Sequence, residues 1–313
     1  MKRIFLSTIL LSFIITSCKK DNDTFVEDQK NEEPQQTLVT DGVVGGRYQF
    51  SSSESLSKMM GELRNDEELL EKKMKELYLK GFRPKYPIGD IENDPELIKL
   101  YEGRPDTVDD ETEEEKEEEN MISDPLLASF IDENNEIVVK DTLYKFTTRG
   151  VFSSHLKDSL KLKNYLKDRQ PQLSAEELLK LRETASGKQQ VADGVYRFIA
   201  PISELERNNI KEEQKRIANL TPANELQPII DGLRVTRGKD NWFLHTLFGE
   251  SRVATEHFDR RHRVKIEFFN QNYGFYKSVG ISVRNQTRRF RIWWASKANE
   301  VVLGINYIYM TYE

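Results

Sequence analysis

The chain has very little cysteine: Cys18 is the only one among its 313 residues. A single cysteine cannot close an intramolecular disulfide, and it cannot supply the set of thiolates that a structural zinc site needs. The fold must therefore be stabilised by packing, hydrogen bonds and ion pairs alone.

Long apolar runs are also scarce. Residues 4–16 form an apolar run that is too short to span a bilayer as a permanent helix, and no other stretch approaches the roughly 20 residues required. With 37% hydrophobic and 32% charged residues, the chain has a soluble composition with a heavy polar load. Its length suits two modest domains, or one domain with appendages.

Catalytic motifs are missing as well. The sequence contains no Gly-x-Ser-x-Gly, no His-Glu-x-x-His and no phosphate loop. His257 and His262 lie near Glu256 and Asp259, but not at a trusted metal-ligand spacing, so we expect no metal site and no cofactor. A pair of catalytic carboxylates for glycoside hydrolysis stays an alternative, because acidic residues are abundant. None of them lies in an apolar stretch that would mark it as catalytic.

Negative charge is concentrated in one place. The net charge is −6, and residues 109–119 are a dense run of aspartate and glutamate. Like charges at this density repel one another and stay solvated, so residues 105–120 are predicted to be an acidic disordered insertion. Calcium binding is the alternative, although the run lacks the alternating oxygen ligands and the turn glycine of a known loop. The mild overall acidity argues against a nucleic-acid partner.

Residues 1–18 combine a charged start at Lys2 and Arg3, the apolar run, and the ending Ile15-Thr16-Ser17-Cys18. This arrangement resembles a bacterial lipoprotein signal peptide with its lipobox. The resemblance implies that residues 1–17 are removed and that the Cys18 thiol carries a lipid, which makes the membrane a partner through that anchor. An ordinary secretory signal or an N-terminal core helix are the alternatives.

Residues 18–41 are rich in Lys, Asp, Glu, Asn and Gln, and we interpret them as a disordered tether. The tether opens with two lysines followed by acids, at residues 19–23. This opening is similar to the charged signals that export lipoproteins of the Bacteroidetes to the cell surface. A generic solvated linker, with the body facing the periplasm, is the alternative.

Residues 42–104 are predicted to be mainly helical. A strand over residues 42–50 precedes a helix whose capping box starts at Ser51, and a second helix begins at Asn65 or Asp66 and stops at Gly81. A short helix is predicted near Pro95, within an otherwise irregular stretch. Residues 121–239 are predicted to mix strands and helices, with a small β-hairpin over residues 137–146 and another strand from Val151.

Several short motifs resemble an uncharacterised family of Bacteroidetes outer-membrane or cell-surface lipoproteins. The motifs are structural in character, and the resemblance implies a location without implying a mechanism. They are Asp124-Pro125 with Phe130, Asn134-Asn135-Glu136-Ile137, Asp141-Thr142-Leu143-Tyr144-Lys145, Gly150-Val151-Phe152, and the earlier Phe50-Ser51, Glu54, Leu56 and Gly81-Phe82.

Residues 240–313 are predicted to form a C-terminal antiparallel β-sheet, a meander of about four strands that makes the main core. One face would pack against the core and the other face would be exposed to solvent. The alternation is carried by Val264, Ile266 and Phe268; Val279, Ile281 and Val283; Phe290, Ile292 and Trp294; and Leu303, Ile305, Tyr307 and Tyr309. The fold class that follows is α+β.

The solvent-exposed face of this sheet is the candidate ligand site. Trp293 would share it with Arg289 and Arg291, and an aromatic ring flanked by arginines can stack on sugar rings or hold anionic groups. The alternative is that Trp293 is covered by other elements and that the arginines keep the sheet soluble.

Two functions compete at this point. The first is a non-enzymatic, lipid-anchored protein of the outer membrane or cell surface that binds a glycan or an envelope protein, or serves a structural role. The second is a surface hydrolase of polysaccharide or peptide that uses paired carboxylates.

Overall fold

The computed structural model describes residues 40–107, 121–167, 175–204, 206–208, 243–246 and 248–297. The predictions for the signal peptide, Cys18, most of the tether, the acidic run at 109–119 and the strand at 303–309 lie outside these residues. The described residues belong to one compact unit that contains helices and β-sheets, which confirms the α+β class.

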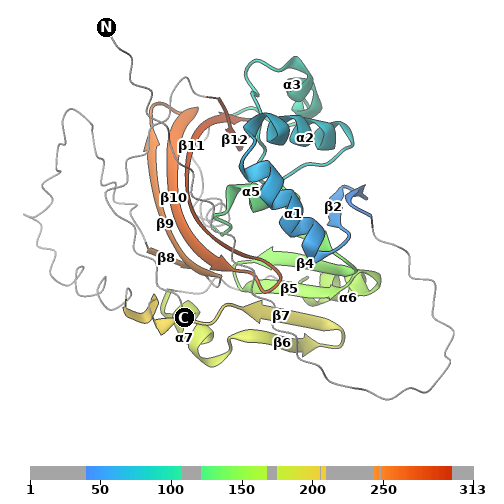
Figure 1. Ribbon diagram of the computed structural model, residues 1–313, viewed down its shortest axis with the longest axis vertical. Helices are drawn as coiled ribbons and strands as arrows, with labels where there is room; N and C mark the ends of the chain where they lie inside the picture. The colour runs from blue at the N-terminus through green and yellow to red at the C-terminus, as the bar shows by residue number, and fades with distance from the viewer. Residues whose placement is uncertain are drawn as a thin grey trace, which may run out of the picture. The chain divides into compact units, whose positions relative to one another are not determined.

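The larger sheet is mixed and has seven described strands, in the order β1-β2-β3-β4-β5-β7-β6 (Figure 1). Strands β2 and β3 pair in parallel, and the other neighbours are antiparallel. The predicted hairpin at residues 137–146 is confirmed as β3 and β4. The strands are β1 (Gly42–Val44), β2 (Arg47–Phe50), β3 (Glu136–Val139), β4 (Thr142–Thr147), β5 (Gly150–His155), β6 (Gly187–Ala192) and β7 (Val195–Ile199).

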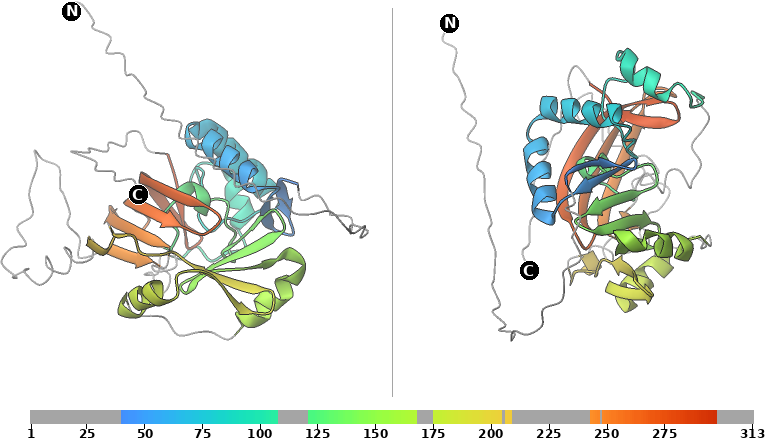
Figure 2. Two further views of the ribbon diagram at one scale, coloured as in Figure 1. Left: turned by 60° about the horizontal axis from the view of Figure 1, so that its bottom comes forward. Right: turned by 90° about the vertical axis from the view of Figure 1, so that its right-hand side faces the viewer.

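The second sheet is an antiparallel meander in the order β12-β11-β10-β9-β8. Its long strands bend strongly, as Figure 1 and the right-hand view of Figure 2 show. The predicted strands around Val264, Val279 and Trp294 are confirmed, and two further strands precede them. The strands are β8 (Phe243–Thr246), β9 (Gly249–His257), β10 (His262–Asn272), β11 (Lys277–Arg289) and β12 (Ile292–Ala295).

Helices start where side chains cap them. Asp66 Oδ1 accepts a hydrogen bond from the Leu69 amide at 2.9 Å, and Asp94 caps the next helix in the same way. Both starts were predicted. The described helices are α1 (Ser53–Arg64), α2 (Glu67–Leu79), α3 (Pro95–Tyr101), α5 (Pro125–Ala128), the 3-10 turn η1 (Leu156–Asp158), α6 (Ser159–Tyr165) and α7 (Ala175–Thr184).

Two local predictions in this part are wrong. Helix α1 is capped by Ser52, one residue later than predicted, because the Ser51 amide instead donates to Asp41 at 2.6 Å. The predicted single strand over residues 42–50 is a hairpin of β1 and β2. Gly45 and Gly46 both have positive φ, which allows the tight turn between them.

The main hydrophobic core is not the C-terminal meander, as the alternation suggested. It joins side chains from 42–104, from the hairpin region and from the second sheet into one cluster. Aromatic rings from distant segments meet in it: Tyr48 packs against Phe50, Phe82 and Phe130, with ring centroids 4.7–6.2 Å apart. The three predicted segments therefore share one core.

Strand β10 and the start of β11 pack with their faces reversed relative to the prediction, whereas Trp294 of β12 is buried as predicted. Phe268 and Val279, on the face expected to be packed, are 43% and 66% exposed, whereas Lys265 and Glu267 on the other face are 1% and 0% exposed. Charges can be buried there because Lys265 Nζ lies 3.1 Å from Glu267 Oε1 and Arg284 binds the other carboxylate oxygen. Alternation distinguishes two faces, but it does not say which one is covered.

A tyrosine fixes the segment that links α2 to α3. The buried Tyr78 hydroxyl donates to the Ile88 carbonyl at 3.0 Å and accepts from the Ile88 amide at 2.9 Å. The Tyr78 ring also packs edge-on against Trp294 of β12. One side chain therefore satisfies both backbone groups of Ile88 and contacts the second sheet.

We predict that Tyr78→Phe lowers the free energy of unfolding by about 1–3 kcal/mol, because the ring stays while both Ile88 groups lose their partner. Chemical denaturation measures this change. Tyr165→Phe is the matched control, because Tyr165 is partly exposed and packs through its ring against Phe152. It should shift stability by less than about 0.5 kcal/mol. Equal losses in the two variants would contradict the role given to the hydroxyl.

Candidate functional site

Trp293 lies inside a cluster of polar side chains. It is only 5% exposed, and the guanidinium carbon of Arg263 lies 3.8 Å from its ring centroid. Arg288, opposite Trp293 on β11, and His257 also approach the ring, at 5.7 and 5.6 Å. The indole thus stacks on groups of the same chain.

Arg289 points to the other face of the sheet, because it is paired with Ile292 across the ladder. Its Nε donates to Asp106 Oδ2 at 2.9 Å, and the Phe290 amide donates to Asp106 Oδ1 at 2.9 Å. Burial alone would raise the pKa of Asp106, but the Phe290 amide, Arg289 and Arg261 outweigh it and lower that pKa. Arg289 therefore anchors residue 106 to the end of β11.

The prediction that Trp293, Arg289 and Arg291 share one face is wrong. Phe290 and Arg291 form the two-residue turn between β11 and β12, both with positive φ, and Arg291 is exposed there. Because the strand reverses at this turn, counting every second residue from 289 to 293 does not follow one face. The three residues do not converge on a common site.

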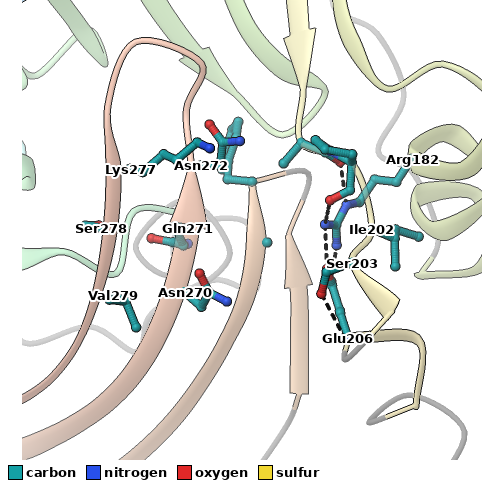
Figure 3. Close-up of a pocket in the computed structure, with 14 residues that line it drawn as sticks. Arg182, Ile202, Ser203, Glu206, Asn270, Gln271, Asn272, Lys277, Ser278 and Val279 are labelled. Carbon is teal, nitrogen blue, oxygen red and sulfur yellow. Dashed lines mark hydrogen bonds and ion pairs between the residues drawn. The ribbon is translucent and has the colours of Figure 1, made fainter. Parts of the chain in front are cut away.

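A pocket of about 550 Å3 lies elsewhere, at the end of the β10–β11 hairpin. Figure 3 shows Asn270, Asn272 and Lys277 of the hairpin on one side and Arg182, Ser203 and Glu206 on the other. Its volume is within the range of roughly 300–1,000 Å3 that is typical of small-molecule sites. Four segments far apart in the sequence build it.

The far wall of the pocket is held by a buried ion pair. Arg182 of α7 is 1% exposed and binds both carboxylate oxygens of Glu206, with Nη2 2.7 Å from Oε2. Its Nε donates to the Ala200 carbonyl at 3.0 Å, and Nη2 also donates to the Pro201 carbonyl at 2.9 Å. The guanidinium is therefore occupied in joining α7 to the segment after β7.

The hairpin wall depends on a close approach of two strands. Gly249 begins β9 at φ +131°, and a Cβ atom there would lie 2.2 Å from the carbonyl oxygen of Asn270. Only glycine permits this contact. The sequence offered no local signal for it, nor for the role of Arg182, because each depends on a partner from another segment.

The side chains that line the pocket from the hairpin are uncharged apart from Lys277, and Val279 is apolar among them. The side-chain amide of Asn270 makes no hydrogen bond within the described chain. Asn272 Oδ1 accepts a hydrogen bond from the backbone amide of Gly274 at 3.0 Å. Lys277 is exposed at the rim. Gln271 points to the opposite side of β10, where the Ser123 amide donates to its side-chain oxygen at 2.9 Å.

His262 forms a second polar cluster, away from the pocket lining. Its Nδ1 lies 2.8 Å from Asp259 Oδ2 and its Nε2 lies 3.2 Å from Glu92 Oε1. The hydrogen bond with Asp259 raises the pKa of His262, burial opposes this, and Glu92 adds to the rise. The pKa of Asp259 is lowered, chiefly by its hydrogen bond with His262. Protonated His262 thus links the turn before β10 to the segment before α3.

In the described part of the chain, no three or more His, Cys, Asp or Glu side chains are grouped so that they could hold a metal ion. Nor is any helix in the described ranges both long and apolar enough to cross a membrane.

We predict a pH-dependent contribution of His262 to stability. Because its folded pKa is raised above the ordinary value of about 6.5, the contribution is complete below that value and is lost as the pH rises through the folded pKa. The difference in unfolding free energy between wild type and His262→Gln should therefore shrink as the pH is raised from about 6 to about 8.5. Urea denaturation at each pH measures it.

Glu92→Gln serves as the companion variant, because it removes one carboxylate and keeps His262. An NMR titration should show a lower His262 pKa in this variant than in wild type. A wild-type to His262→Gln difference that stays constant over the pH range would contradict the prediction.

Searches of protein-family models, of curated proteins and of solved structures find no match to this chain.

Proposed function

We propose that the chain is a lipid-anchored protein of the outer membrane or cell surface that acts by binding a ligand. The anchoring part rests on the lipobox-like ending at Cys18 and on the polar tether that follows it. The resemblance to Bacteroidetes lipoproteins, carried by the motifs quoted above, agrees with this location.

The binding part rests on one observation, the pocket at the end of the β10–β11 hairpin. Its walls are fixed by the buried Arg182–Glu206 pair and by the close approach at Gly249. A pocket whose walls are held in place loses little conformational entropy when a ligand enters, and this favours binding.

The same geometry supports binding over hydrolysis. Carboxylate-based glycoside hydrolysis needs two carboxyl groups roughly 5–10 Å apart, facing the substrate. Among the described residues that line the pocket, Glu206 is the one carboxylate, and Arg182 binds both its oxygens. A carboxylate held in this way is a weak general base, because the ion pair stabilises its charged form.

The anchor is tested by fractionating cells that express the full chain as wild type, Cys18→Ala or Thr24→Ala. We expect wild type and the tether control Thr24→Ala in the membrane fraction, and Cys18→Ala in the soluble fraction, because Cys18 is the only thiol that can carry the lipid. Mass spectrometry of the N-terminal peptide checks the lipid directly.

Protease treatment of intact cells then distinguishes the two orientations. Cleavage of the wild-type body from outside would place it on the cell surface, and protection would place it in the periplasm. Membrane retention of Cys18→Ala equal to wild type would contradict the lipid anchor.

A further inference from the structure

The pocket at the β10–β11 hairpin carries little unbalanced charge. Its charged lining residues in the described chain are Arg182, Glu206 and Lys277, and the first two neutralise each other in a buried pair. Lys277 lies exposed at the rim, where water screens it. A strongly charged ligand would lose its hydration without gaining a buried counter-charge, so the pocket favours an uncharged ligand.

Its polar groups can both donate and accept hydrogen bonds. The Asn270 amide offers two N–H donors and an acceptor, and the Asn272 amide keeps its N–H groups after Oδ1 binds Gly274. The Ser203 hydroxyl accepts from the Glu206 amide at 3.1 Å and still has its own proton to donate. Ligands with several hydroxyl groups have the matching mixture of donors and acceptors.

Apolar surface lies beside these amides on the same face of the hairpin. Val279 is directly opposite Asn270, and Phe268 precedes Asn270 by two residues, so all three side chains project from one face. Both Val279 and Phe268 are exposed. A sugar ring has hydroxyl groups at its edge and C–H groups on its faces, which is the combination that this surface can contact.

A peptide ligand fits the site less well. Peptides commonly bind to sheets by pairing their backbone with a free edge strand. Strand β10 is paired on both sides, by β9 and β11, whereas β12 pairs with β11 only at residues 286–289. Recognition at the β10 wall must therefore come from side chains such as Asn270 and Asn272, and that suits a compact ligand.

We infer that the pocket binds a short neutral saccharide. Asn270, Asn272 and Ser203 bind its hydroxyl groups, and Val279 with Phe268 contacts its C–H faces. This inference rests on the proposed binding function and names its ligand class. It is independent of the anchor at Cys18, so the fractionation experiment and the binding experiment can fail separately.

The test uses the full-length protein in detergent on an array of neutral oligosaccharides, uronate-containing oligosaccharides and peptides, followed by calorimetric titration of the oligosaccharide that binds. We expect a neutral saccharide to bind, with little change in affinity as salt is raised. Asn270→Ala should weaken binding about three- to tenfold, the size expected for a lost neutral hydrogen bond. Val279→Asp, which places a charge against the sugar, should weaken it more than tenfold.

Asn164→Ala is the matched control, because Asn164 is an exposed asparagine of α6 that does not line the pocket. It should leave affinity unchanged. Thermal unfolding of each variant checks that Asn270→Ala and Val279→Asp are folded, which is expected because both positions are exposed.

Four results would overturn the inference. The first is that no saccharide on the array binds, and the second is that Asn270→Ala and Val279→Asp leave saccharide binding intact. The third is that only uronates bind, with a steep salt dependence and a loss of binding in Lys277→Gln. The fourth is that only peptides bind.

Discussion

The burial of Trp294 holds strand β12 against helices α2 and α3 and the segment between them. Its ring meets Tyr78 of α2 and Tyr101 of α3 edge-on, at 6.2 and 4.9 Å between centroids, and the adjacent Ala295 exchanges hydrogen bonds with residues 87 and 89. The indole N–H has no partner in the described structure, which costs about 1–3 kcal/mol. Burying about 150–250 Å2 of ring surface contributes about 4–6 kcal/mol, which exceeds the cost of the unpaired indole N–H.

A second junction positions the hairpin that carries the pocket. The buried Asp124 carboxylate caps α5 through the Leu126 and Leu127 amides and also accepts hydrogen bonds from Arg64 and Tyr276. Gln271 binds residues 121 and 123 from the same side. Because one face of the hairpin end is fixed against this junction, the other face is left to form the pocket wall.

Local signals in the sequence predicted the elements well, and long-range contacts explain the failures. Asp66 marked a helix start because a cap acts within three residues, and Pro95 marked the start of the next helix. Periodicity gave the strands β10 and β11 but not their buried face, since Glu267 is buried only because Lys265 and Arg284 pair with it. The pocket could not be predicted, because Arg182 and Gly249 acquire their roles from partners in other segments.

Trp293, the aromatic residue expected to bind ligand, packs inside the fold, while exposed side chains of the β10–β11 hairpin line the pocket. Trp293 is covered by Arg263, whereas Phe268 remains exposed beside Asn270. Arg182 is buried and held by Glu206 and two backbone carbonyls, and Gly249 has no side chain, so recognition falls to the exposed side chains of the hairpin. Ligand preference at this site can therefore change by substitution while the walls of the pocket stay in place.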